Sequence, residues 1–167
     1  MHLDAGGGIG TIARGGGHFM FGMGPAWKRV RLGLRLDHTI VRRVDREDEG
    51  IGARMSSTTG GLELEFPIEL GRFTLLPGLE LRAGGIRARG VGGRDRRTRW
   101  VPWVIAAAGF GFVWEATRIV GLRVAAAIEV PLARHTFVFD DIEVTRTHPV
   151  GGRWVLGLEI RVPPRPR

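Results

Sequence analysis

The chain has 167 residues, enough for one domain, and with 43% apolar and 25% charged residues it is not an intrinsically disordered chain. No stretch approaches the roughly 18 uncharged apolar residues that a membrane helix requires, so a helical membrane protein is excluded. The absence of cysteine excludes disulfides and thiolate chemistry, and the net charge of +8 comes from 25 basic residues of which only Lys28 is lysine, a bias typical of GC-rich genomes.

Alternating apolar and polar residues predict a series of β-strands, because successive side chains of a strand point to opposite faces. In chain order, weak alternation at residues 2–12 and 18–24 is followed by clear alternation at residues 29–37 and 62–70. Further strands are predicted at residues 75–87, 100–113, 120–132 and 153–162. The segment 100–113 is apolar on both faces, so its facing stays open. The pattern predicts eight strands.

The predicted connections alternate in length after the first hairpin. Short turns are expected at residues 13–17, 25–28, 71–72 and 114–118, and long loops at residues 42–57, 87–98 and 134–149. An up-and-down antiparallel meander with short turns at one end and long loops at the other is the simplest topology with this alternation. We therefore predict an all-β fold, an eight-stranded antiparallel up-and-down β-barrel over residues 1–162, followed by a Pro/Arg-rich tail at residues 163–167.

Two kinds of barrel fit this pattern, and they differ in the face that points outward. A soluble, lipocalin-like barrel would enclose the apolar side chains and bind a small apolar ligand. The interior of an eight-stranded barrel is only just wide enough to be filled by side chains, and the bulky apolar set is hard to fit inside. Turned outward, the same set forms the apolar band of roughly 25 Å that a membrane barrel needs. Exposure of Leu122, Val124 and Ile128 would favour the membrane barrel.

The polar face of the predicted strands carries equal numbers of acidic and basic residues. The proposed lumen charges are Arg29, Arg31, Arg35, Arg82, Arg123, Arg153 and Arg161 with Asp37, Glu63, Glu65, Glu69, Glu80, Glu129 and Glu159. A balanced set suits a closed interior, where an unpaired charge is costly.

Aromatic residues gather near the predicted strand ends. Trp27, Phe73 and Trp114 fall beside short turns, whereas Trp100, Trp103, Phe137, Phe139 and Trp154 fall at the long-loop ends. Membrane barrels carry an aromatic girdle at each membrane interface, so we interpret the two groups as such girdles.

The alternating strands and the ending Val-Gly-Gly-Arg-Trp-Val-Leu-Gly-Leu-Glu-Ile-Arg-Val at 150–162 give the chain a family resemblance. Over essentially its whole length it resembles the small eight-stranded outer-membrane β-barrels, of which the membrane domain of OmpA is a familiar member. The resemblance implies a bacterial outer-membrane location, periplasmic short turns, extracellular long loops and no cofactor. We expect a monomer with a structural or surface-interaction role.

One predicted long loop carries the strongest local charge bias of the chain. Its basic residues, opposed only by Asp95, are Arg87, Arg89, Arg94, Arg96, Arg97 and Arg99. Nothing in the loop supplies base stacking or groove reading, so nucleic acid is not the expected partner. If the loop is extracellular, the phosphates of lipopolysaccharide are natural partners for bidentate guanidinium contacts.

Motifs for catalysis are scarce. The glycines at residues 6–10 and 15–17 complete no nucleotide-binding motif, and no two histidines have the spacing of a helical zinc site. Ser56 and Ser57 follow His38, which leaves open a lipid-acting hydrolase or acyltransferase, but no motif places a nucleophile beside a base. We therefore predict no enzymatic activity and no metal or cofactor site.

Overall fold

The computed structural model describes residues 2–9, 16–23, 29–46, 51–91, 97–139 and 141–160, and every regular element among them is a β-strand. The long strands are β1 (His2–Ile9), β2 (Gly16–Met23), β3 (Arg31–Arg46), β4 (Ile51–Glu65), β6 (Phe73–Val91), β7 (Thr98–Glu115), β8 (Val120–Pro131) and β11 (Gly151–Ile160). The short strands are β5 (Ile68–Leu70), β9 (Thr136–Phe139) and β10 (Ile142–Arg146). In the described part of the chain, no helix has the length and apolar character needed to cross a membrane.

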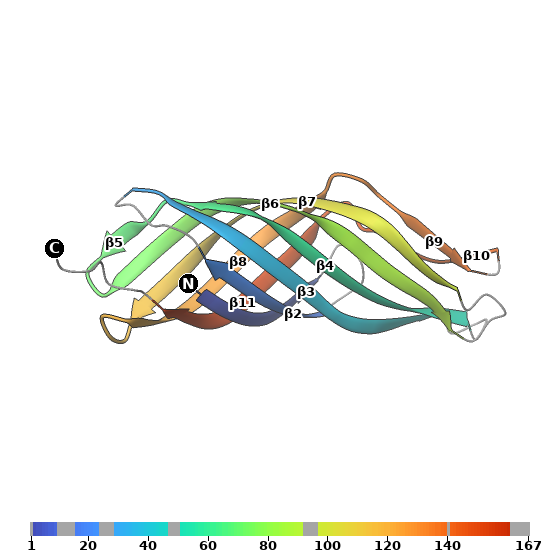
Figure 1. Cartoon of the computed structure of the whole chain (residues 1–167), viewed down its shortest axis with the longest axis horizontal. Helices are drawn as coiled ribbons and strands as arrows, with labels where there is room; N and C mark the ends of the chain where they lie inside the picture. The colour runs from blue at the N-terminus through green and yellow to red at the C-terminus, as the bar shows by residue number, and fades with distance from the viewer. Residues whose placement is uncertain are drawn as a thin grey trace.

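The long strands form a closed antiparallel ring. Each pairs with the next in the order β1, β2, β3, β4, β6, β7, β8 and β11, and β11 pairs back with β1. The strands run obliquely to the long axis of the molecule (Figure 1), as closure of a barrel requires. The predicted eight-stranded up-and-down barrel is confirmed.

Two of the predicted long loops are largely strand, which corrects the expected boundaries. β3 continues to Arg46 and β4 begins at Ile51, so most of the expected loop at residues 42–57 belongs to a hairpin. Likewise β6 continues to Val91 and β7 begins at Thr98. The backbone ladder does not depend on side-chain polarity, so the strands extend beyond the segments that alternate. The extensions of β3 and β4 (residues 42–46 and 51–57) and of β6 and β7 (residues 87–91 and 98–99) form a wall at the long-loop end of the barrel (Figure 1), which we call the tall wall.

The third long connection, residues 134–149, contains a hairpin of its own. β9 and β10 pair antiparallel with a register shift between Glu143 and Thr145. The base of the hairpin is closed by the backbone N–H of His135, which donates to Thr147 Oγ1 at 2.8 Å, and by the N–H of Thr147, which donates to the His135 carbonyl at 2.9 Å. The hairpin lies at the end of the barrel formed by the tall wall (Figure 1).

The predicted strand at residues 62–70 is interrupted. β4 ends at Glu65 and the short β5 resumes beside β6. Pro67 lies in the gap, and a proline has no N–H for the ladder. The Phe66 N–H donates to the Pro77 carbonyl at 2.9 Å, so one hydrogen bond links β4 to β6 at the break.

The outer surface of the barrel is apolar and the inner surface is polar. Leu122, Val124 and Ile128 on β8 are exposed by 38%, 48% and 62%, whereas Arg123 and Glu129 on the same strand are buried. This facing contradicts the soluble barrel with an apolar interior. An outward belt of leucine, valine, isoleucine and phenylalanine suits hydrocarbon instead.

The facing of β7, which the sequence left open, follows the same rule. Trp103, Ile105 and Val113 are buried inside the barrel, and Phe110 and Phe112 are exposed on the belt. The strand is apolar on both faces because its inner face also packs against apolar neighbours at the long-loop end.

Candidate functional site

Charged side chains from five strands meet inside the barrel. The buried set comprises Arg35, Asp37, Glu63, Glu65, Glu80, Arg82, Arg123, Glu129, Arg153 and Glu159, each exposed by no more than 8%. Arg31 is partly buried and contacts the same set. Burial of this many charges is tolerable only when each is paired and hydrogen-bonded. We call this set the lumen network.

The part of the network nearer the long-loop end is organised around two arginines, Arg82 and Arg153. Arg82 contacts Asp37 at 2.8 Å and also pairs with Glu129. Arg153 contacts Glu80 at 2.5 Å and Glu129 at 3.1 Å. Each arginine therefore joins at least two carboxylates, and Glu129 is shared by both.

The part nearer the short-turn end has the same alternation of charges. Arg123 contacts Glu65 at 2.6 Å and Glu63 at 3.2 Å through the same guanidinium nitrogen. Arg35 also pairs with Glu63, so Glu63 lies between two cations. Arg31 Nη1 donates to both carboxylate oxygens of Glu159, each at 3.1 Å.

One contact joins the two parts. Arg35 Nε lies 3.2 Å from Glu80 Oε1, and Arg82 Nε lies 3.1 Å from the same oxygen. Arg123 Nη1 lies 4.0 Å from Glu159 Oε2, so ion pairs link Asp37 to Arg31 through residues of all five strands. Glu63 and Glu80 are directly opposite each other on neighbouring strands, where like charges repel. Arg35 pairs with both carboxylates and so reduces this repulsion.

The local sequence makes room for long side chains by placing small residues opposite them. Gly61 lies between Arg35 and Arg82 in the ladder, and a Cβ at Gly61 would overlap the Leu81 carbonyl and crowd the Arg82 side chain. Arg123 is opposite Gly157, and Arg153 is opposite Ala127. An inward arginine paired with glycine or alanine on the next strand is a sequence signal for a filled lumen. Alternation within one strand does not reveal this signal, because it depends on the pairing of two strands.

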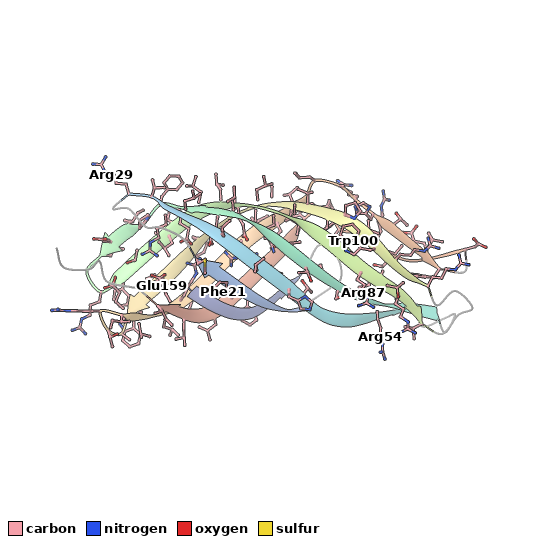
Figure 2. The ribbon with its side chains drawn as sticks, viewed as in Figure 1. Phe21, Arg29, Arg54, Arg87, Trp100 and Glu159 are labelled. Atoms are coloured by element: carbon pink, nitrogen blue, oxygen red, sulfur yellow. The ribbon has the colours of Figure 1, made fainter. Side chains whose placement is uncertain are left out.

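Three of the expected lumen charges are not part of the described network. Arg29 precedes β3 and is exposed; Figure 2 places it at the opposite end of the barrel from Arg54, pointing away from the wall. Glu69 lies on the short β5, whose residues are all exposed, so the break at Pro67 removes it from the lumen. Arg161 lies outside the described residues. The described network contains five arginines and six carboxylates. Arg29 and Glu69 are thus corrections to the expected set of seven charges of each sign, and the place of Arg161 stays a prediction.

The aromatic girdles are present in part. Phe73 and Trp114 are exposed at the short-turn end, and Trp100 and Trp154 are exposed on the outer surface, whereas Trp27 lies outside the described residues. The assignments of Trp103, Phe137 and Phe139 were wrong, because these three side chains are buried. They face inward and form a core.

That core lies inside the tall wall. Its members are Ala53, Met55, Ile86, Ala88, Trp103, Ile105, Phe137 and Phe139. The two phenylalanines come from β9, so the hairpin is packed against the inner face of β4, β6 and β7. We call this set the apolar plug. Sequence reasoning missed it because Ala53, Met55, Ala88, Phe137 and Phe139 lie in segments that were read as loops, and the facing of the segment 100–113 was left open.

The predicted basic loop is divided between two faces of the tall wall. Arg87 and Arg89 lie on β6 and are exposed on the outer surface. Arg99 is on the same face of β7 as Trp103, with its guanidinium carbon 5.7 Å from the Phe139 ring centroid. Arg97 is exposed just before β7, and Arg94 and Arg96 lie outside the described residues. The expectation of one basic loop is therefore corrected for Arg87, Arg89 and Arg99, which lie on strands.

Of the two serines considered for catalysis, Ser56 is half-buried on the outward face of β4, opposite Arg87, and Ser57 is on the inner face. Ser57 is buried on the inner face of β4 and donates to Thr39 Oγ1 at 3.0 Å. His38 is exposed, and its Nδ1 lies 2.8 Å from Thr58 Oγ1. Because Thr58 and Ser57 are consecutive on one strand, their side chains point to opposite faces of the wall. His38 and Ser57 therefore do not meet.

Comparisons with known proteins address the fold. No family model matches the sequence, and no curated protein matches it. The chain is similar to the crystal structure of Neisserial surface protein A, NspA, with a TM-score of 0.68 and 10% identity over 96% of this chain and 94% of that chain.

Two further solved structures give the same result. A major outer membrane protein from Thermus thermophilus has a TM-score of 0.64 and 12% identity, covering 96% of this chain and 98% of that chain. Ail, the attachment invasion locus protein of Yersinia pestis, has a TM-score of 0.53 and 12% identity, covering 96% of this chain and 95% of that chain. At such low identity the likeness concerns the fold. With its closed ring and its outward apolar belt, the chain has the fold of the small eight-stranded outer-membrane β-barrels.

Proposed function

We propose that this protein is an integral outer-membrane barrel with a largely occluded lumen, and that its role is structural or surface interaction without catalysis. The continuous lumen network carries this proposal. Its side chains bridge strands on opposite sides of the barrel, and its arginines form ion pairs with its carboxylates. Such a network stabilises the interior without leaving a wide aqueous path.

Two further observations support occlusion. A cavity beside Arg35, Glu63 and Arg123 has a volume of only about 30 Å³, which is room for one or two water molecules. The apolar plug lies inside the barrel at the long-loop end, on the inner face of β4, β6 and β7. A water-filled channel would need polar walls and an open path through both regions.

A surface-interaction role follows from the tall wall. We propose that the long-loop end is extracellular, and that its exposed arginines contact anionic groups of lipopolysaccharide in the outer leaflet. We further propose a monomer, because a closed ring leaves no long strand with a free edge for pairing with a second copy.

Purified protein reconstituted in planar lipid bilayers is expected to show no porin-like conductance. The reason is that the lumen network and the apolar plug lie in series along the path through the barrel. The comparison for sensitivity is a variant that opens both regions, with Arg82 and Arg153 replaced by serine and Phe137 and Phe139 replaced by alanine, and it should conduct more than the wild type. Large, steady channels from wild-type monomer would contradict occlusion and favour a pore.

A further inference from the structure

The outer wall of the barrel changes character abruptly above the apolar belt. Along the outward face of β6, the exposed Leu79, Leu81 and Ala83 are followed by Gly85 and then by Arg87 and Arg89. Outward residues are two positions apart, so Arg87 is about 7 Å along the strand from Gly85. The arginines therefore lie at the height where hydrocarbon gives way to lipid headgroups.

A third arginine joins them from the neighbouring strand. Arg54 on β4 is exposed and is the direct cross-strand partner of Arg89. Figure 2 shows Arg54, Arg87 and Trp100 in the half of the barrel that forms the tall wall. Sequence analysis did not select Arg54, because it lies in a segment that was read as loop.

These three arginines have no counter-charge in the described part of the protein. Arg54, Arg87 and Arg89 make no ion pair with a described carboxylate, in contrast to the arginines of the lumen network. Like charges directly opposite on neighbouring strands destabilise a sheet. An external anion within reach of all three guanidinium groups would remove that repulsion.

An aromatic surface lies next to the arginines. Trp100 on β7 is the direct partner of Arg87 and is 66% exposed. Its indole ring lies over Gly85, where a Cβ would overlap the ring. The glycine thus lets the indole lie flat against the wall with its other face free. One row closer to the belt, His38 and Thr58 are bonded to each other on the same outer surface.

We propose that Arg54, Arg87, Arg89 and Trp100 form a binding site, the outer-wall site, for the phosphorylated sugar headgroup of an outer-leaflet glycolipid. The guanidinium groups bind the phosphate through charge-assisted hydrogen bonds, for which their planar donors are suited. The free face of the Trp100 indole packs against the apolar face of the sugar ring. This inference rests on the proposed extracellular orientation and names the partner's headgroup and the residues that hold it.

The test measures how tightly the barrel, folded in phosphatidylcholine bilayers, binds lipopolysaccharide. Intact lipopolysaccharide is compared with lipopolysaccharide whose phosphates have been removed enzymatically. The wild type is expected to bind the phosphorylated form at least tenfold more tightly, as one charge-assisted contact is worth roughly a factor of ten. The variant with Arg54, Arg87 and Arg89 each replaced by glutamine is expected to lose this preference. The matched control is Arg72→Gln with Arg118→Gln, which removes exposed arginines from the short turns and should retain it.

A second arm tests the sugar. Trp100→Leu is expected to weaken binding of lipopolysaccharide several-fold and to leave binding of phosphatidylglycerol unchanged, because phosphatidylglycerol has a phosphate and no sugar ring. Equal affinity of the wild type for the two lipids would overturn the assignment of a sugar headgroup. Equal loss in the short-turn control would overturn the site.

Insertion is measured on the same samples, so that two failures are distinguishable. Resistance of the folded barrel to SDS until it is heated reports insertion independently of headgroup binding. Loss of this resistance in the wild type would contradict the proposed membrane barrel. Normal insertion without a preference for phosphorylated lipopolysaccharide would overturn only the outer-wall site.

Discussion

Replacing Arg123 by alanine is expected to lower the free energy of unfolding of the barrel in lipid bilayers by about 3 kcal/mol. The Arg123 guanidinium is buried and contacts Glu65 at 2.6 Å and Glu63 at 3.2 Å. Its removal leaves Glu65 without that cation in a space that water barely enters, and an uncompensated buried charge is costly. Urea titration of the folded barrel in bilayers measures the loss.

Two comparisons make the Arg123 result specific. Arg118→Ala, in the exposed turn after β7, deletes an arginine side chain that is surrounded by water. It should change the free energy of unfolding by no more than about 0.5 kcal/mol. The double variant with Arg123→Ala and Glu65→Ala should lose less free energy of unfolding than the sum of the losses in the two single variants, because the two residues interact. A neutral Arg123→Ala would mean that water solvates the lumen charges.

Val124→Arg is expected to destabilise the inserted barrel by roughly 2 to 4 kcal/mol, because it brings a charge into hydrocarbon near the middle of the membrane. Val124 is exposed on the belt near the centre of β8. The same substitution at Val120 or Leu132, towards the two interfaces, should cost less, and Ile128 should be intermediate.

The depth profile is what separates lipid contact from packing. Arginine at the inward Ala125 provides the comparison, since its cost should depend on volume and on pairing with Glu129 more than on depth. Folding free energies from urea titration give the series. A flat series over Val120, Val124, Ile128 and Leu132 would count against the membrane assignment.

The barrel was predictable from sequence because its alternation has a period of two and is continuous across the belt. On β8, Leu122, Val124 and Ile128 alternate with Arg123 and Glu129, and the same pattern encodes both the lipid face and the lumen face. The facing followed from volume, since an eight-stranded interior cannot enclose so many bulky apolar side chains.

The tall wall was not predictable by the same reasoning. Above the belt, β3 and β4 pass through Arg42 to Arg46 and Ile51 to Ser57, where apolar and polar residues no longer alternate regularly. A strand outside the membrane has no lipid face to keep apolar, so the pattern is lost while the backbone ladder continues. Arg54 and the plug residues Ala53 and Met55 were missed for this reason.

The partners within the lumen network depend on the stagger of the closed ring. Arg153 and Glu80 are distant in sequence and on strands that are not neighbours, yet they are 2.5 Å apart. Alternation predicts that both face inward, but only the register around the whole barrel determines their relative height. Glu69 illustrates the opposite case. Its place in the alternation predicts an inward side chain, but the strand break at Pro67 removes it from the lumen.

The most direct test of the central claim is lipid contact of the outward face, measured by site-directed spin labelling. The sequence contains no cysteine, so Val124→Cys and Ala125→Cys give unique labelling sites at neighbouring positions on opposite faces of β8. In bilayers, the label at position 124 is expected to collide frequently with oxygen, which dissolves in lipid, and rarely with a water-soluble nickel chelate. The label at position 125 should be shielded from both. A label at position 124 that collides mainly with the nickel chelate, or one that is shielded while position 125 contacts lipid, would contradict the outward apolar belt.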